Sequence, residues 1–502
     1  MGRYKKLIPF VLGPLVFILL EIAGPPPSMN QNAFHVLCTT SWIALWWVFE
    51  AVPIAVTALL PIVLFPITGA LEISETTESF GHKYIFLYMG GFMIAIAIER
   101  WNLHKRIALN IIYLIGSDVS RIILGFMIAT AFLSMWISNT ATSVMMLPIG
   151  TAIVSQFNSR KSGSNGEDNT FGKALMLAIA YSASIGGFAT LIGTPPNLIL
   201  AGILEETYDV KISFFQWMVF GLPTSLILNI VCWKYLTKYA FKFEETSFPG
   251  GKAEISRMLK ALGKTSYEEK AVFLVFILTA IAWMSRSLIQ SFIPSIDDTI
   301  IALIGGISLF AIPDKTNNRP LITWEEATQL PWGIILLFGG GMALAKGFST
   351  TGLAEWIAVQ MTQMEGLSIL LLILVLVTLV NFLTEITSNL ATTAMLLPVL
   401  GPMALSFDLH PFTLMVSVTL AASCAFMLPV ATPPNAVVFG SGYLHIPDMI
   451  KTGVVMNLVS IVLITFATYL LLPFIWDIDP NQFPEAFRLY LKEQGQTFNI
   501  NK

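Results

Sequence analysis

Two short polar clusters embedded in apolar sequence are the parts of this chain best suited to bind a small ligand. Residues 138–148 read SNTATSVMMLP and residues 388–398 read SNLATTAMLLP, so the two segments agree at seven of eleven positions. Each is followed by a second shared motif, GTPPN at 193–197 and ATPPN at 431–435. Serine, threonine and asparagine side chains can both donate and accept hydrogen bonds. The two repeated segments therefore give the chain two similar sets of groups that could bind a ligand.

The chemistry of the TPPN motifs follows from proline. Proline has no amide hydrogen, and it disfavours helix in the residue before it. Each motif therefore predicts a helix that stops, frees carbonyl oxygens and restarts with free N-terminal amides. Carbonyl oxygens suit a sodium ion, and helix N-terminal amides, with their partial positive charge, suit a carboxylate or a sulfate. One such break beside a Ser-Asn cluster could hold both ligands.

A purely structural role is the alternative, because single serines, threonines and asparagines often join or cap helices without touching a ligand. Two copies, each paired with a break, favour a binding site. The glycines at 90–91 and 339–341 are left out of the site, since such glycines more often mark close packing. Glu385 precedes Ser388 by three residues, and Met135 holds the matching position in the first copy. We expect Glu385 to have a folding or supporting role rather than to touch the ligand.

The composition places these motifs in a membrane protein. The 502 residues are 55% hydrophobic and only 12% charged, with a mean hydropathy of +0.73. A helix that spans a bilayer needs about 20 mostly apolar residues. The sequence predicts eleven crossings, within 8–22, 34–52, 53–69, 84–101, 172–204, 212–235, 271–291, 298–312, 333–347, 412–441 and 451–474. The expected fold class is an all-α polytopic membrane protein.

Two further apolar stretches, 121–155 and 369–405, carry the Ser-Asn clusters near their middles, which predicts two re-entrant hairpins. Cytoplasmic loops are enriched in Lys and Arg. The N-terminal segment, the flanks of the first hairpin and the connector 236–270 are basic, whereas the flanks of the second hairpin at 363–365 and 407–410 contain no Lys or Arg. We expect one hairpin to enter from each face, with the N-terminus in the cytoplasm and the C-terminus outside.

Opposite orientations of the two copies would make an inverted repeat, which places binding sites near the midplane of the membrane. The expected organisation is an N-terminal helix with the first external loop at 1–33, a first repeat at 34–235 with a broken helix at 172–204, an amphipathic cytoplasmic connector at 236–270, a second repeat at 271–475 with a broken helix at 412–441, and a tail at 476–502.

Other classes are disfavoured. The first segment resembles a signal peptide, but its apolar run is long for one and prolines 25–27 are a poor cleavage context, so we expect a retained helix. A net charge of −3, with basic residues in short loops, gives no nucleic-acid-binding surface. The three cysteines lie in apolar segments and are expected to be buried. The five histidines show no metal-binding spacing, so we expect neither a membrane enzyme nor an organic cofactor. A channel would need charge rings or a carbonyl filter.

The SNT tip, its SNxAT counterpart, the two TPPN breaks and the segment FEAVPIAVT at 49–57 resemble the divalent anion/sodium symporter family over roughly residues 34–475. Members of this family carry succinate, malate, related dicarboxylates, citrate or sulfate, usually with sodium. The resemblance implies sodium-coupled symport of C4-dicarboxylates across the inner membrane. It also implies a homodimer in lipid, in which a transport domain moves against a fixed scaffold by an elevator mechanism.

The resemblance also assigns residues to two sodium sites and a substrate site. One sodium site would be formed by Ser134, Ser138, Asn139 and the carbonyl of Gly193. Its symmetry mate would be formed by Thr384, Ser388, Asn389 and the carbonyl of Ala431. The substrate would face Asn139, Thr140, Thr194, Pro195, Asn389, Thr432 and Pro433.

One position departs from the pattern of the family. Dicarboxylate-transporting members often carry threonine there, and some citrate carriers carry valine, whereas this chain has Leu390. Leucine cannot donate a hydrogen bond to a carboxylate and narrows the pocket, so a sodium-coupled citrate or sulfate transporter is one alternative. A sodium-independent dicarboxylate exchanger is another. The hydroxyl and asparagine residues at both expected ion positions favour symport.

Overall fold

The protein is all-helical in the parts that the structure describes. The computed structural model describes residues 2–116, 118–160, 170–243, 250–361 and 368–493. Within these ranges six helices are long and apolar enough to cross a membrane, by length and composition, and six shorter apolar helices accompany them. Cys38, Cys232 and Cys424 are buried and unpaired by disulfides, as expected. The all-α fold of a membrane protein is confirmed, and the number of eleven crossings stays a prediction.

Within the described residues, the first half of the chain forms twelve α-helices. They are α1 (Gly2–Ala23), α2 (Gln31–Phe49), α3 (Ile54–Thr57), α4 (Leu60–Thr68), α5 (Ile73–Glu78), α6 (Lys83–Arg100), α7 (Leu103–Ile115), α8 (Val119–Ser134), α9 (Asn139–Arg160), α10 (Thr170–Gly187), α11 (Pro195–Tyr208) and α12 (Phe214–Lys234). The segment 53–69, expected as one helix, is two helices, because prolines at 53 and 61 each begin a new one. The hydropathy of the sequence did not predict α7, because this helix buries only one of its sides.

The second half follows the connector helix α13 (Gly251–Ala261). Its further helices are α14 (Tyr267–Met284), α15 (Arg286–Gln290), α16 (Asp298–Ala311), α17 (Trp324–Ala327), α18 (Trp332–Thr350), α19 (Leu353–Met361), α20 (Ile369–Leu383), α21 (Asn389–Ser406), α22 (Pro411–Ala422), α23 (Pro433–Phe439), α24 (Ile446–Phe466), α25 (Leu472–Trp476) and α26 (Glu485–Glu493). Both TPPN motifs begin a helix, α11 and α23, after a non-helical stretch.

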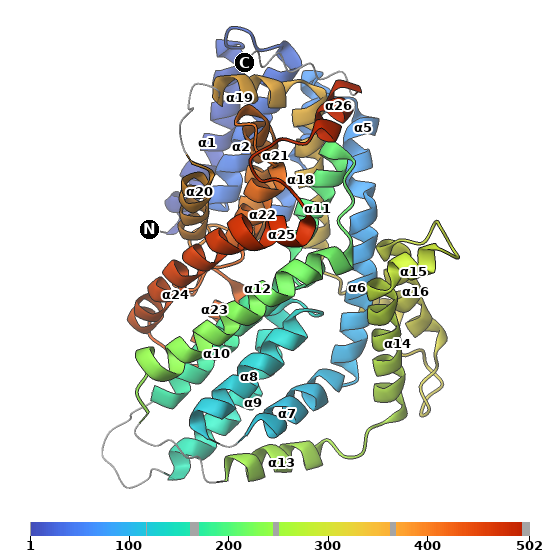
Figure 1. Ribbon diagram of the computed structural model, residues 1–502, viewed down its shortest axis with the longest axis vertical. Helices are drawn as coiled ribbons and strands as arrows, with labels where there is room; N and C mark the ends of the chain where they lie inside the picture. The colour runs from blue at the N-terminus through green and yellow to red at the C-terminus, as the bar shows by residue number, and fades with distance from the viewer. Residues whose placement is uncertain (1, 117, 161–169, 244–249, 362–367, 494–502) are drawn as a thin grey trace.

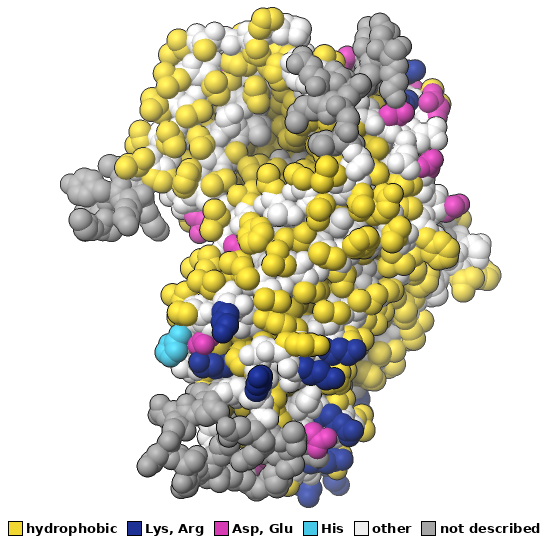
Figure 2. All heavy atoms as spheres, turned by 60° about the vertical axis from the view of Figure 1, so that its left-hand side comes forward, with side chains coloured by type: hydrophobic (Ala, Val, Ile, Leu, Met, Phe, Trp, Pro, Cys, Tyr) yellow, Lys and Arg dark blue, Asp and Glu magenta, His cyan; other side chains and the backbone are white. Residues whose placement is uncertain are grey.

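The two Ser-Asn clusters lie at turns between paired helices, α8 with α9 and α20 with α21. In Figure 1 the first pair occupies the lower half of the molecule and the second pair the upper half, with α13 at the lower end. In Figure 2, Lys and Arg side chains gather toward that lower end and hydrophobic side chains cover the middle. The basic loop at Arg160 and Lys161 and the flank at 363–365, which also entered the orientation argument, lie outside the described side chains.

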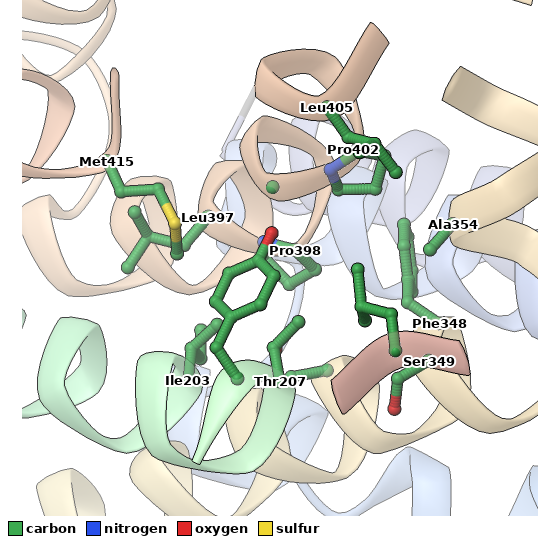
Figure 3. Close-up of a pocket in the computed structure, with 14 residues that line it drawn as sticks. Ile203, Thr207, Phe348, Ser349, Ala354, Leu397, Pro398, Pro402, Leu405 and Met415 are labelled. Carbon is green, nitrogen blue, oxygen red and sulfur yellow. The ribbon is translucent and has the colours of Figure 1, made fainter. Parts of the chain in front are cut away.

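The two halves pack directly on each other through α11 and α21. Figure 3 shows Ile203 and Thr207 of α11 facing Leu397 and Pro398 of α21 across a small, mostly aliphatic pocket. Leu491 of α26 also lines this pocket and is buried. The chain beyond the last apolar helix, expected as a tail, therefore contributes a helix to the packing of the two halves.

One arginine of the first half binds both the end of the connector and the start of α14. Arg106 of α7 binds Glu269 at the start of α14 through two hydrogen bonds, from Nε to Oε1 at 2.9 Å and from a terminal nitrogen to Oε2 at 3.1 Å. The same guanidinium donates to the carbonyls of Gly263 and Leu262, at 3.2 and 3.3 Å. Glu269 in turn accepts from the amide of Ser266, at 2.8 Å. A planar guanidinium suits this multiple, mostly shielded contact.

We expect Arg106→Gln to lower the free energy of unfolding by about 1–3 kcal/mol, because a shielded carboxylate and two carbonyls lose their donor. The measurement is thermal unfolding of the purified protein in detergent. Arg121→Gln is the matched control. Arg121 lies 3.5 Å from Asp118 and its side chain is 63% exposed, so its loss should change stability little. Equal melting temperatures for the two variants would contradict the expectation.

Candidate functional site

The first Ser-Asn cluster forms a close group of oxygens at the tip of its hairpin. Ser134, the last residue of α8, is fully buried. Its Oγ lies 2.6 Å from Oδ1 of Asn139, the first residue of α9, and 2.7 Å from the carbonyl oxygen of Ala183 in α10. The two ends of the hairpin tip and the helix before the first break therefore meet at one hydroxyl.

The second half repeats this group on different helices. Thr384 follows α20 and is also fully buried. Its Oγ1 lies 2.6 Å from Oδ1 of Asn389 at the start of α21 and 3.0 Å from the carbonyl oxygen of Ala422 at the end of α22. The two groups match atom for atom: a hydroxyl, the asparagine five residues later, and a carbonyl of the helix that precedes the break.

In each of these oxygen groups, the hydroxyl has fewer hydrogens to donate than it has close oxygen neighbours. A hydroxyl has one hydrogen to donate, yet each hydroxyl lies within hydrogen-bond distance of two carbonyl-type oxygens. One of the two contacts in each group therefore has no hydrogen between its oxygens. A cation would remove that repulsion. Rotation of the asparagine amide would also remove it, by turning Nδ2 toward the hydroxyl.

Glycine is required beside the first group. A Cβ atom on Gly187, the last residue of α10, would overlap the amide of Asn139, and one on Gly193 would overlap the carbonyl oxygen of Gly187 and lie 3.0 Å from that of Ser134. The backbone of the first break thus approaches the hairpin tip more closely than any side chain would allow. This contact brings Gly193, expected as a sodium ligand through its carbonyl, next to Ser134, and Gly187 next to Asn139.

The two breaks have matching backbones and are held by the same residue type. Thr194 and Thr432 have φ/ψ angles of −139°/139° and −140°/149°. The side-chain amide of Asn197 donates to the carbonyls of Phe188 and Thr190, at 3.3 and 2.7 Å. That of Asn435 donates to the carbonyls of Ala425 and Leu428, at 3.2 and 3.0 Å. Both asparagines are fully buried. No role was expected for them from the sequence, although each holds the last position of a TPPN motif, which was the signal that could have indicated one.

Of the remaining expected site residues, some make contacts between the two halves and others make only local contacts. The structure brings Pro195 of the first half together with the tip of the second, because Pro195 and Leu390 line one small apolar cavity with Tyr84, Tyr88 and Phe338. The helices that begin at Asn139 and Pro433 also pack against each other. For the others the contacts are local: Ser138 accepts from the amide of Ala141 at 3.2 Å, and Thr432 from that of Asn435 at 3.3 Å.

Exposure separates the expected substrate residues. Thr140 and Pro433 are exposed, and Asn139, Ser138, Ser388, Asn389 and Pro195 are half-buried, whereas Thr194, Thr432, Gly193 and Ala431 are buried. The half-buried asparagines can thus offer one side to the buried oxygen group and the other to the outside. Leu390 is buried, so the position that departs from the family's pattern faces apolar neighbours.

The structure pairs two helix–turn–helix segments, two breaks and two matching oxygen groups. Comparison with known sequences identifies the class of protein. The sequence model described as the transmembrane region of sodium:sulfate symporters matches residues 5–476, so the chain belongs to that family. The sodium-dependent dicarboxylate transporter SdcS of Staphylococcus saprophyticus is 46% identical over 484 residues, which cover 95% of this chain and 93% of that protein. SdcS of Staphylococcus aureus strain USA300 is 44% identical with the same coverage.

Two solved structures share the fold at low sequence identity. MtrF of Neisseria gonorrhoeae, from a class of antimetabolite efflux pumps, aligns with a TM-score of 0.54 and 13% identity over 93% of this chain and 98% of its own. The YdaH transporter of Alcanivorax borkumensis aligns with a TM-score of 0.57 and 14% identity over 90% of this chain and 100% of its own. At these identities the likeness concerns the fold alone.

We expect Thr384→Val to weaken sodium binding while Thr384→Ser leaves it near the wild-type level, because only serine keeps the hydroxyl between Asn389 and Ala422. The measurement is the rise in melting temperature with sodium chloride, compared with potassium chloride at equal ionic strength. Loss of one hydrogen-bonding group, worth about 1 kcal/mol, should raise the sodium concentration for half the effect about fivefold. The same sodium dependence in both variants would remove Thr384 from the ion site.

Proposed function

We propose that this protein carries C4-dicarboxylates such as succinate, malate and fumarate together with sodium ions across the cell (inner) membrane. The observation that carries the proposal is the duplicated oxygen group, Ser134 with Asn139 and Thr384 with Asn389, each placed beside a broken helix. Neutral oxygens in a shielded place suit a small cation. The names of the similar Staphylococcus transporters support sodium and a dicarboxylate as the transported pair.

In this proposal each sodium ion enters one oxygen group. The first is bound by Ser134, Ser138, Asn139 and the Gly193 carbonyl, and the second by Thr384, Ser388, Asn389 and the Ala431 carbonyl. The asparagine amide serves two states. With sodium absent, its Nδ2 donates to the hydroxyl, and with sodium bound, Oδ1 faces the ion and Nδ2 is released toward the substrate side.

The dicarboxylate lies between the two hairpin tips. Asn139 and Asn389 donate to its carboxylates, and Thr140, Thr194, Pro195, Thr432 and Pro433 complete the site. Because sodium orients both asparagines, the anion binds well only after the ions have bound, which couples the two gradients. The two tips differ in one respect: Thr140 offers a hydroxyl, whereas Leu390 offers a methyl surface and limits the width of the anion.

The wider architecture is part of the same proposal. Two inverted repeats, 34–235 and 271–475, face each other, joined by the cytoplasmic connector and followed by the C-terminal segment. The protein forms a homodimer, has eleven crossings with its N-terminus inside and its C-terminus outside, and moves the two hairpins and broken helices as an elevator. The basic lower end in Figure 2 supports placing that end in the cytoplasm.

Two alternatives follow from specific residues. Leu390 makes citrate or sulfate an alternative substrate. Leucine has no hydroxyl to donate, and a smaller or differently shaped anion would not need that hydrogen bond. A sodium-independent exchanger would have no use for two hydroxyl–asparagine groups, so their presence in both halves favours symport over exchange.

The test is uptake of radiolabelled succinate into proteoliposomes with an inward sodium gradient. A potassium gradient and vesicles preloaded with succinate are the controls, and unlabelled malate, fumarate, citrate and sulfate are the competitors. We expect uptake that requires sodium, needs no internal succinate, and is reduced more by malate or fumarate than by citrate or sulfate. Equal uptake in potassium would reject symport, and uptake only into preloaded vesicles would identify an exchanger.

Replacement of either tip asparagine should weaken the sodium dependence of this uptake. Asn139→Ala and Asn389→Ala each remove an oxygen from one ion site and a donor from the substrate site, so both the sodium half-saturation and the succinate KM should rise, by about fivefold or more. Asn317→Ala, in the loop between α16 and α17, is the control and should behave as wild type. Unchanged sodium dependence in both tip variants would mean that the ions bind elsewhere.

A further inference from the structure

An open groove runs along α14 and α16, which pack side by side at the edge of the molecule (Figure 1). Its volume is about 700 Å³, and most of the side chains that line it are apolar. Along α14 it extends from Tyr267 to Ala282, which is about 22 Å of helix at a rise of about 1.5 Å per residue. Leu274 and Ile304 line it from the two helices and are 58% and 60% exposed. The described residues thus leave this apolar surface uncovered.

The groove has a floor because its two helices meet at a glycine. A Cβ atom on Gly305 of α16 would overlap the hydroxyl oxygen of Thr279 in α14, and it would lie 2.9 Å from Ile94 of α6. The backbone of α16 therefore approaches α14 more closely at this point than any side chain would allow. This contact sets the depth of the groove, which is a feature of the helix pair and not a gap between surface side chains.

A second hollow, of about 350 Å³, lies on the other side of α14, against α7. Phe273 lines it from α14, and Ile107 and Ile111 line it from α7. Lys270 borders both this hollow and the groove. Residues three and four positions apart share one face of a helix, so Phe273 and Leu274 lie one turn beyond Lys270, one in each cavity. The two apolar cavities therefore converge on one lysine.

The exposed charge at this end of the groove is positive. Lys270 and Lys315 are exposed, and neither forms an ion pair with the residues that the structure describes. The ammonium group of Lys315 lies over the ring of Tyr267, 4.9 Å from its centroid. The nearby carboxylates are buried and accept hydrogen bonds: Glu268, Glu269 and Asp314. The two ammonium groups are thus free to bind an anion at the surface.

The dimensions of the groove match a lipid. In the proposed orientation, α14 begins at the cytoplasmic face, next to the connector, so Tyr267, Lys270 and Lys315 lie at the level of the lipid headgroups. The hydrocarbon of one leaflet is about 15 Å deep, half of a core of about 30 Å. A groove of about 22 Å can therefore take an acyl chain along its whole length when the headgroup is at Lys270. Anionic lipids give the cytoplasmic leaflet a negative surface that attracts lysine.

We propose that this surface binds one anionic phospholipid of the cytoplasmic leaflet. One acyl chain lies in the groove between α14 and α16, the other lies in the hollow beside α7, and Lys270 and Lys315 bind the phosphate. A second copy of the chain fits this surface less well, because charged side chains are depleted in the cores of protein interfaces and Lys270 lies between the two cavities. The site goes beyond the proposed transport and takes from it only the orientation.

The test is native mass spectrometry of the purified full-length protein in detergent, titrated with phosphatidylglycerol or with phosphatidylcholine of the same acyl chains. We expect one phosphatidylglycerol per chain to be retained at a concentration about tenfold or more below that needed for phosphatidylcholine, because two lysines attract the anionic headgroup. Lys270→Gln combined with Lys315→Gln should remove this preference. Lys451→Gln is the matched control and should keep it, since Lys451 is exposed at the start of α24 and lines neither cavity.

A second variant tests the apolar part of the site. Ala271 lines the groove beside Lys270, so the ring of Ala271→Phe would take the place of several acyl methylene groups and weaken retention of both lipids about tenfold. Equal retention of the two lipids by wild type, or an unchanged preference in the double lysine variant, would overturn the inference. Conversion of a dimer to monomers by Ala271→Phe, with lipid retention unchanged, would overturn it too and assign the groove to a contact between copies. Lipid retention is measured without transport, so failure of the proposed symport would not change these outcomes.

Discussion

Unpaired backbone polar groups inside a membrane are the constraint on which the rest of this structure depends. A helix that stops in a lipid environment exposes amides and carbonyls that cost several kcal/mol each when unsatisfied, as a rough figure. This chain breaks two helices, before Thr194-Pro195 and before Thr432-Pro433, and supplies an internal partner for each break. Asn197 and Asn435 bind the freed carbonyls, and Glu385 binds the freed amides of the second break. The breaks persist because side chains replace the water that is missing.

Satisfying the breaks also brings the ligand groups together. The hydroxyls of Ser134 and Thr384 each touch a carbonyl of the helix that ends at the break and an asparagine of the hairpin tip. A hairpin tip and a broken helix are therefore joined at one hydroxyl in each half. A cation bound among these oxygens would stabilise the joined arrangement, which gives a physical route from ion binding to the position of the tips.

The motifs predicted these units well because their chemistry is local. Proline sets the start of α11 and α23, and the repeated Ser-Asn pairs lie at the turns between α8 and α9 and between α20 and α21. The partners of Glu385 could not be predicted, since Asn457 lies 72 residues away and the amides of residues 426–428 carry no side-chain signal. Hydropathy also missed α7, which buries only one of its faces, and joined α3 to α4, although α4 begins anew at Leu60 and Pro61. Long-range contacts and short amphipathic helices depend on packing that no local pattern records.

The differences between the halves carry as much meaning as their likeness. The repeated TPPN motifs give each half the same unpaired backbone groups, and in both halves an asparagine side chain binds the freed carbonyls. They part at the hairpin turn, where Met135 and Glu385 occupy matching positions, and at the tip, where Thr140 matches Leu390. The first difference places a carboxyl group at the turn of one half only, and the second places a hydroxyl at the tip of one half only. Since succinate is itself symmetrical, the unequal halves of the proposed site would hold one end of the anion differently from the other.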